Sequence, residues 1–184
     1  MKTINNIAII YTNGENPDFV NLCELLDKNL NEINGKERQE IYAQYNLLHD
    51  IHDVWIAYEN NNPVGCASFK QYEEHVAEVK RVFVRPEYRG KGISKILMAA
   101  VEKKAIEKGY TSLILETSRL HKEAIHLYQN RGYAIIKKFG QYQGLNKSIC
   151  MKKELVEDKI IHKALHQKNM AQCLLLCSAN IIFA

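Results

Sequence analysis

Apolar and polar positions follow two periods along this chain, and together these predict a sheet with helices packed on it. Short apolar or alternating runs, typical of strands, occupy 7–11, 54–58, 64–69, 76–84, 113–117, 133–138 and 148–152. Apolar residues spaced three or four positions apart, typical of a helix face, occupy 16–35, 37–48, 90–108 and 122–130. The order contains hairpins and one β-α-β crossover, which we expect to be right-handed. It predicts an α/β fold with a mixed, mostly antiparallel central sheet flanked by helices.

The length of 184 residues suits one domain with a substantial core, which we predict over residues 1–155. Residues 156–184 are expected to form a helical C-terminal extension that packs on the domain or on a second copy in a homodimer. Their histidines and cysteines are spaced unlike those of common zinc modules: His162, His166, Cys173 and Cys177. We therefore expect no metal.

The five cysteines are odd in number and scattered, which is typical of a reduced cytosolic protein rather than of a disulfide framework. No signal peptide is apparent at the N-terminus. No apolar stretch approaches the length that spans a bilayer. These observations predict a cytoplasmic protein without a membrane partner.

Positive charge is concentrated between Lys80 and Lys108, where nine Lys or Arg residues stand against three Glu, although the net charge of the chain is only +4. Such a concentration suits a small polyanion. Nucleic-acid-binding proteins usually show a longer basic face or a recognisable module, and the sequence has neither. We therefore expect no nucleic-acid partner.

Within this basic segment, a short loop with two glycines leads from the strand ending at Val84 into the next helix. A helix start presents unpaired backbone N–H groups and the positive end of the helix dipole. Gly90 and Gly92 let an anion approach the backbone closely, and Arg89 and Lys91 add positive charge. The spacing matches neither a P-loop nor a dinucleotide-binding fingerprint. The loop therefore indicates a phosphate-bearing ligand, the alternative being a simple turn with surface charge.

Two separated motifs resemble the GNAT superfamily of acyl-CoA-dependent N-acyltransferases over residues 53–155. The family's pyrophosphate loop, Arg/Gln-x-x-Gly-x-Gly/Ala, is matched by Arg89, Gly92 and, with serine in the last position, Ser94. The family's Asn-x-x-Ala-x-x-Leu-Tyr-x-x-x-Gly-Phe is matched downstream by Ala124, Leu127, Tyr128 and Gly132. This second motif departs from the family at both ends, with His121 for Asn and Tyr133 for Phe.

The resemblance implies that acetyl-CoA is the co-substrate and lies where strand 76–84 separates from strand 113–117. Its pantetheine arm would pair with the backbone of Val82 and Val84, and its diphosphate would lie on the N–H groups of the loop. A backbone N–H near Val82 or Phe83 would stabilise the oxyanion. The expected coenzyme-binding residues are Val82, Phe83, Val84, Arg89, Gly90, Lys91, Gly92, Ile93, Ser94, His121 and Ala124.

The implied reaction needs a base, because an alkyl amine with a pKa near that of lysine, roughly 10.4, arrives mostly as ammonium. Glu78 is the first candidate, since the family's strand often carries its glutamate there. Alternation places it on the same face as Lys80 and Val82. Glu116 on the neighbouring strand is the second candidate. The alternative for Glu78 is a solvated charge paired with Lys80.

The reaction also needs an acid for the departing thiolate, and the second motif gives this role to Tyr128. A phenol with a pKa near 10 stays protonated at neutral pH, so it can donate to the thiolate. The alternative is a core tyrosine with no part in the reaction.

The sequence says least about the acceptor. The N-terminal helices, with Tyr42 and Tyr45, and the loop 139–147 are expected to shape its pocket. The prediction is an N-acetyltransferase acting on a primary amine of a small molecule or amino acid, by direct attack in a ternary complex. Acetylation of a protein lysine or N-terminus, and a non-catalytic acyl-CoA-binding regulatory module, are the alternatives.

Overall fold

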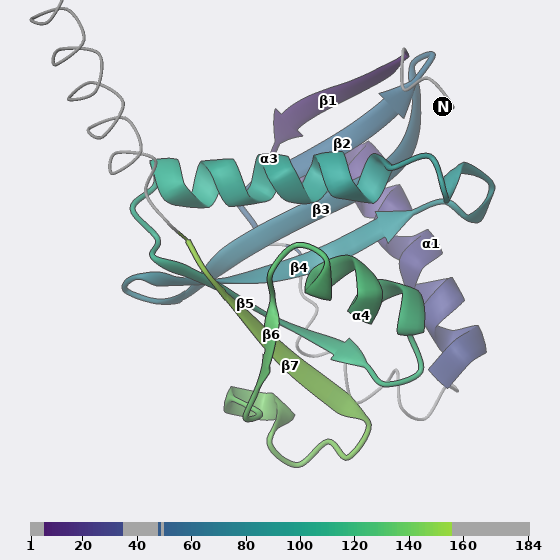
Figure 1. The fold of residues 1–184 in the computed structure, drawn as a ribbon. Coiled ribbons are helices and arrows are strands. Elements are labelled where there is room, and N and C mark those ends of the chain that lie inside the picture. The colour runs from purple at the N-terminus through teal and green to yellow at the C-terminus, as the bar shows by residue number, and fades with distance from the viewer. Residues whose placement is uncertain (1–5, 35–47, 49, 156–184) are drawn as a thin grey trace, which may run out of the picture.

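The computed structural model describes residues 6–34, 48 and 50–155 (Figure 1). The strands are β1 (Ile7–Thr12), β2 (Asp53–Glu59), β3 (Asn62–Glu73), β4 (Val76–Val84), β5 (Ser112–Ser118), β6 (Ala134–Ile136) and β7 (Ser148–Glu154). The helices are α1 (Pro17–Asn34), α3 (Ile93–Glu107) and α4 (Lys122–Gln129), with 3-10 turns η1 (Pro86–Tyr88) and η2 (Gly140–Tyr142). The helix predicted at 37–48 and the extension 156–184 lie outside the described residues, so the homodimer stays a prediction.

The strands form one seven-stranded sheet in the order β1-β2-β3-β4-β5-β7-β6. Every neighbouring pair is antiparallel except β4 and β5, which are parallel and joined through α3. The fold class is therefore confirmed as a mixed, mostly antiparallel sheet flanked by helices. No helix in the described part of the chain has the length and apolar character needed to cross a membrane.

Helices cover both faces of the sheet, and each face has its own apolar core. On one face α3 lies across β2, β3 and β4 (Figure 1), and its Leu97, Met98 and Val101 are fully buried. On the opposite face, Phe19 and Leu22 of α1 pack against β2 and β3. Fully burying one such side chain contributes about 1.5–3 kcal/mol, so both helices are held mainly by apolar packing.

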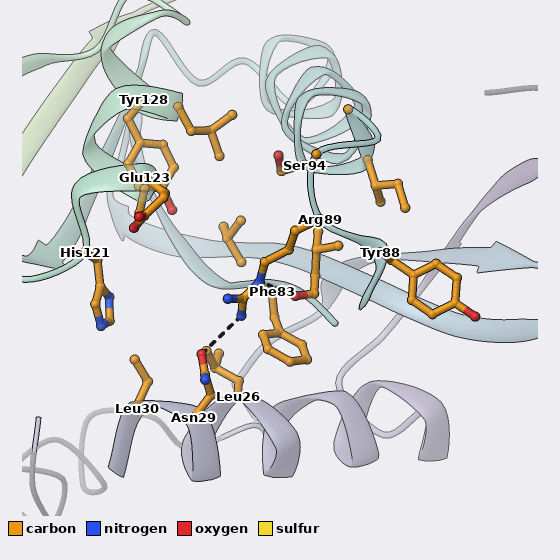
Figure 2. A pocket seen from close by; sticks show the side chains of 17 residues that line it. Leu26, Asn29, Leu30, Phe83, Tyr88, Arg89, Ser94, His121, Glu123 and Tyr128 are labelled. Atoms are coloured by element: carbon orange, nitrogen blue, oxygen red, sulfur yellow. Dashed lines mark hydrogen bonds between the residues drawn. The ribbon is translucent and has the colours of Figure 1, made fainter. Parts of the chain in front are cut away.

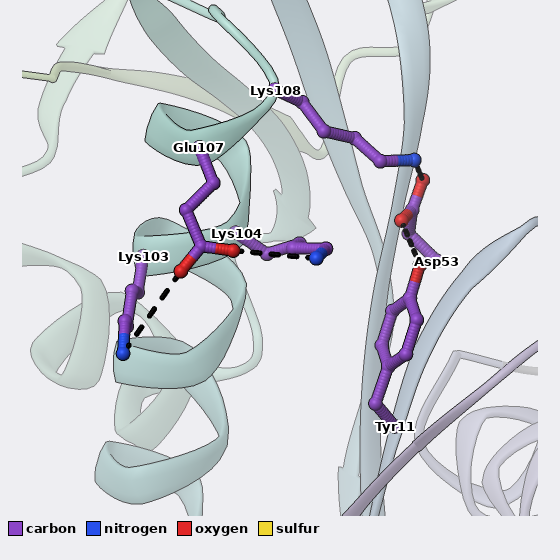
Figure 3. Close-up of polar contacts among 6 residues, drawn as sticks. All are labelled: Tyr11, Asp53, Lys103, Lys104, Glu107 and Lys108. Atoms are coloured by element: carbon purple, nitrogen blue, oxygen red, sulfur yellow. Dashed lines mark hydrogen bonds and ion pairs between the residues drawn. The ribbon is translucent and has the colours of Figure 1, made fainter.

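The edge strand β1 is joined to its neighbours by a polar contact at Asp53, the first residue of β2 (Figure 3). The Tyr11 hydroxyl donates to one carboxylate oxygen of Asp53 at 2.6 Å, and Lys108 Nζ contacts the other at 2.6 Å. The hydrogen bond to Asp53, followed by burial, raises the pKa of Tyr11 to about 12. This tie links β1, β2 and the end of α3.

The parallel pairing of β4 with β5 covers only three residue pairs, Val76 with Ser112, Ala77 with Leu113 and Glu78 with Ile114. Beyond Glu78 the strands separate, although β4 continues to Val84 and β5 to Ser118. In Figure 1 the two arrows diverge toward the start of α4. The opening predicted between these strands is therefore present.

A β-bulge interrupts β4 at Arg81, which has a positive φ of 54°. Cys66 of β3 pairs with Phe83 while Ser68 pairs with Lys80, so β4 holds one residue more than β3 over this stretch. The extra residue reverses the alternation. Glu78 and Lys80 contact each other on one face, whereas Val82 packs into the α3-side core. The prediction that Val82 shares the face of Glu78 is therefore wrong.

Gly65 is needed where β3 passes close to the end of β4. A Cβ added there would lie 2.7 Å from the carbonyl oxygen of Phe83, which is backbone and cannot turn away. We expect Gly65→Ala to lower the free energy of unfolding by about 1–3 kcal/mol through this overpacking, measured by urea denaturation. Gly144→Ala is the control, because nothing lies within 4 Å of its added Cβ. Equal stability of the two variants would contradict the prediction.

Candidate active site

A cavity of about 340 Å³ lies at the opening between β4 and β5 (Figure 2). Its walls come from α1 on one face of the sheet and from α4 and the start of α3 on the other. A cavity can have walls on both faces only where the sheet itself is interrupted. The divergence of β4 and β5 supplies that interruption.

Most of the residues predicted to bind the coenzyme line this cavity, although they come from separate parts of the chain. They are Val82, Phe83, Val84, Arg89, Gly90, Gly92, Ile93, Ser94, His121 and Ala124, together with Tyr128. Lys91 does not line it, because its Nζ pairs with Glu59 Oε1 at 3.1 Å and lies over the Tyr88 ring. Leu26, Asn29 and Leu30 of α1 also line the cavity, and no motif in the sequence identified them.

The glycine loop gives the cavity an uncapped helix start. Gly90 and Gly92 have positive φ angles of 76° and 83°, which glycine adopts without strain. Gly92 is the N-cap of α3, and no side chain caps it. The first N–H groups of a helix are unpaired within the helix, so this end of the cavity suits an anion.

Arg89 crosses the cavity from the loop to α1 (Figure 2). Its Nε donates to the carbonyl oxygen of Val84 at 3.1 Å, and its Nη2 donates to Asn29 Oδ1 at 3.1 Å. The guanidinium therefore already donates a hydrogen bond to one backbone carbonyl oxygen at the end of β4. It also brings a permanent positive charge to the cavity.

The opposite wall of the cavity carries two titratable side chains of the second motif. His121 precedes α4, and its Nε2 is buried with no hydrogen-bond partner among the described residues. Burial lowers the pKa of His121, against an opposing effect of Glu123, so the imidazole is neutral at neutral pH. Tyr128 is 6% exposed. Burial, followed by the charge of Glu116, raises the pKa of Tyr128 well above its usual value.

Glu78 lies outside the lining of the cavity and is 1% exposed. Its Oε1 accepts a hydrogen bond from the Tyr142 hydroxyl at 2.7 Å and from Lys80 Nζ at 3.4 Å. Lys80 Nζ also donates to the Tyr142 hydroxyl at 2.9 Å. Burial lowers the pKa of Lys80, while Glu78 opposes that shift. The pairing of Glu78 with Lys80 is therefore present, but it is buried rather than solvated.

No sequence motif identified Tyr142 as a hydrogen-bond partner of Glu78. The residue lies within the loop 139–147, which was assigned to the acceptor pocket only as a whole. Tyr142 is buried among the exposed residues Gln143 and Gly144. An aromatic residue within a polar loop is the only sequence signal for it.

Glu116 is partly exposed and points to the same face of the sheet as Glu78. Leu113 and Leu115 belong to the α3-side core, so alternation along β5 turns Glu116 to the other face. Its charge favours the protonated forms of Tyr128, Lys80 and Tyr142. Like Glu78, Glu116 is not among the residues that line the cavity.

Comparisons with known proteins agree with this geometry. The family model "Acetyltransferase (GNAT) family" matches residues 19–133. The chain is 30% identical over 151 residues to an IAA acetyltransferase of Azospirillum brasilense, covering 82% of this chain and 99% of that one. It is 33% identical over 87 residues to an amino-acid acetyltransferase of Mannheimia succiniciproducens, covering 47% of this chain and only 19% of that one.

A solved GNAT acetyltransferase of Elizabethkingia anophelis with acetyl-CoA bound has the same fold. The match has a TM-score of 0.61 and 22% identity, and it covers 82% of this chain and 99% of that one. Family model, full-length relative and fold agree with the two motifs and with the cavity they line. The chain therefore belongs to the GNAT family of acetyl-CoA-dependent N-acetyltransferases.

Proposed function

We propose that this enzyme transfers the acetyl group of acetyl-CoA to a primary amine of a small molecule or amino acid, by direct attack in a ternary complex. The observation that carries the proposal is one cavity at the β4–β5 opening, whose lining includes both an uncapped helix start, which suits an anion, and the phenol of Tyr128. The Mannheimia relative is an amino-acid acetyltransferase by name, which supports that class of acceptor.

In this proposal the diphosphate of the coenzyme lies on the N–H groups between Gly90 and Ser94. The pantetheine arm follows the end of β4, whose side toward β5 has no strand partner beyond Glu78 among the described residues. Because Arg89 holds the Val84 carbonyl, an arm that pairs with Val84 displaces the guanidinium toward the diphosphate. A backbone N–H of Val82 or Phe83 would then face the thioester carbonyl and stabilise the oxyanion.

We expect Arg89→Met to weaken the binding of coenzyme A about tenfold, because it removes a cation beside the diphosphate. Isothermal titration calorimetry with coenzyme A and with pantetheine, which has no diphosphate, measures the effect. Pantetheine binding should change little. Arg119→Met is the matched control, since Arg119 is exposed and outside the cavity. An equal loss of affinity for both ligands would contradict a contact to the diphosphate.

Glu116 is the better candidate for the base that takes the proton of the acceptor amine. The carboxylate of Glu78 is 1% exposed and already accepts from Tyr142 and Lys80, so an ammonium cannot reach it without moving both. Glu116 is partly exposed and flanks the opening from the neighbouring strand. We therefore assign the role of base to Glu116. Glu78 instead holds Tyr142 in place.

Tyr128 is the proposed acid. Its raised pKa keeps the phenol protonated at every pH at which the enzyme is expected to work. The thiolate of the departing coenzyme has a conjugate acid with a pKa near 8.5, so it needs a proton at neutral pH. Tyr128 lines the cavity from α4 and can supply that proton.

We expect Tyr128→Phe to lower kcat roughly hundredfold, since general acid catalysis contributes on the order of 10²–10⁴. The affinity for acetyl-CoA should change little, because only one hydroxyl is lost. Thiol release with a panel of amines gives kcat, and calorimetry gives the affinity. The control is Tyr133→Phe: Tyr133 is buried with its ring 5.8 Å from that of Tyr128. An unchanged kcat in Tyr128→Phe would remove it from the acid role.

Glu116→Gln should lower kcat/KM roughly hundredfold at about pH 7, and the loss should shrink as the pH approaches about 10. The loss should shrink because the acceptor amine gives up its own proton near its pKa of roughly 10.4 and then needs no base. Glu78→Gln is the comparison, because its amide oxygen can still accept from Tyr142. A larger, pH-dependent loss in Glu78→Gln would return the base to Glu78.

A further inference from the structure

A buried ion-pair cluster lies on the α3 face, away from the cavity. Glu102 of α3 is 7% exposed. Its carboxylate accepts two hydrogen bonds from the guanidinium of Arg131, from Nε to Oε1 at 2.9 Å and from Nη2 to Oε2 at 2.6 Å. Lys153 of β7 contacts the same Oε2 at 2.8 Å. The bidentate geometry fixes the direction of the guanidinium plane as well as its distance.

Arg131 also connects the start of α3 with α4, and both of these line the cavity. Its Nη1 donates to the carbonyl oxygen of Lys95 at 3.2 Å, and Lys95 directly follows Ser94 of the glycine loop. Its backbone N–H donates to the carbonyl oxygen of Tyr128 at 3.0 Å. One residue thus touches the first turn of α3 with its side chain and Tyr128 with its backbone.

The turn after α4 holds Arg131 in this position. The Tyr128 carbonyl also accepts from the backbone N–H of Tyr133 at 3.0 Å, and Gly132 between them has a positive φ of 86°. Such a left-handed glycine is a common helix end. The backbone of Arg131 is therefore tied to the last turn of α4, and its side chain reaches from there to Glu102.

Apolar packing alone fixes α4 weakly. The helix has eight residues; Tyr128 is its one buried side chain, and Ala124 and Leu127 are only partly buried against the core. A short helix with one buried anchor can rotate or slide at small cost, because most of its stability comes from tertiary packing. The contacts of Arg131 to Glu102 and to the Lys95 carbonyl restrict both motions.

We propose that Arg131 is a positioning residue for acetyl transfer: it holds the Tyr128 hydroxyl at a fixed place relative to the glycine loop, and so relative to the bound thioester. The inference rests on the proposed function, in which Tyr128 is the acid. A misplacement of about 1 Å can cost on the order of a hundredfold in rate. Lysine could not replace this residue fully, because one ammonium cannot contact both oxygens of Glu102 in a fork.

A double-mutant cycle tests this role. Arg131→Met should lower kcat about tenfold while the KM for acetyl-CoA changes less than about twofold, because the coenzyme loop keeps its own conformation. In the Tyr128→Phe background, Arg131→Met should lower kcat no further, since there is no acid to misplace. Arg131→Lys should give an intermediate loss of kcat.

Lys153→Met is the matched control. It removes the other cation from Glu102, but Lys153 belongs to β7 and has no bond to α4 among the described residues. It should lower the melting temperature and leave kcat unchanged. Melting temperature and coenzyme A affinity are measured for every variant, and Arg131→Lys replaces Arg131→Met in the cycle if the latter does not fold.

The outcomes are distinct. A loss of kcat from Arg131→Met that is equal in both backgrounds would show a merely structural role and overturn the proposal, while a low kcat in Tyr128→Phe alone would keep the proposed function. An unchanged kcat in Arg131→Met would also overturn it. If Tyr128→Phe alone keeps full activity, the acid assignment fails, and the positioning role fails with it.

Discussion

The site depends on one constraint, the early end of the parallel pairing between β4 and β5. Three residue pairs hold the strands together, and the last of them joins Glu78 to Ile114. Beyond that point β4 offers its backbone to a ligand instead of to a strand, and the sheet no longer separates its two faces. Because α3 and α4 follow these two strands in the chain, their first turns come to lie on either side of the same opening.

A buried polar cluster lies at the closed end of the opening, on the face of the sheet opposite the α3-side core. Glu78, Lys80 and the Tyr142 hydroxyl are buried together and contact one another. Removing either charged member would leave the other charge buried without its counter-ion, which costs far more than the net contribution of the intact contact. The loop that carries Tyr142 is thus tied to β4 where the strands separate.

The sequence carried the local rules of this fold but not its long-range contacts. Turn residues and the spacing of apolar residues predicted where the helices and strands lie. The two motifs predicted residues that line the cavity, because each motif is a short continuous stretch with its own backbone geometry. The face of Val82 was mispredicted because strict alternation was carried through Lys80 and Arg81, two consecutive charged residues at which the bulge shifts the register by one. Lys91 turns away toward Glu59, and Tyr142 meets Glu78 across 64 residues. Such pairings follow from tertiary structure alone.

The proposed acid and base lie on opposite faces of the sheet, beside the same β4–β5 opening. Tyr128 belongs to the α3-side core, while Glu116 points to the face of Glu78. After burial, the charge of Glu116 is the next cause of the raised pKa of Tyr128. Burial and this charge both favour the protonated phenol while the amine approaches. In the proposed reaction, a proton moving from the amine to Glu116 would neutralise that charge and lower the pKa of Tyr128. The phenol would then be a better donor at the step in which the thiolate departs.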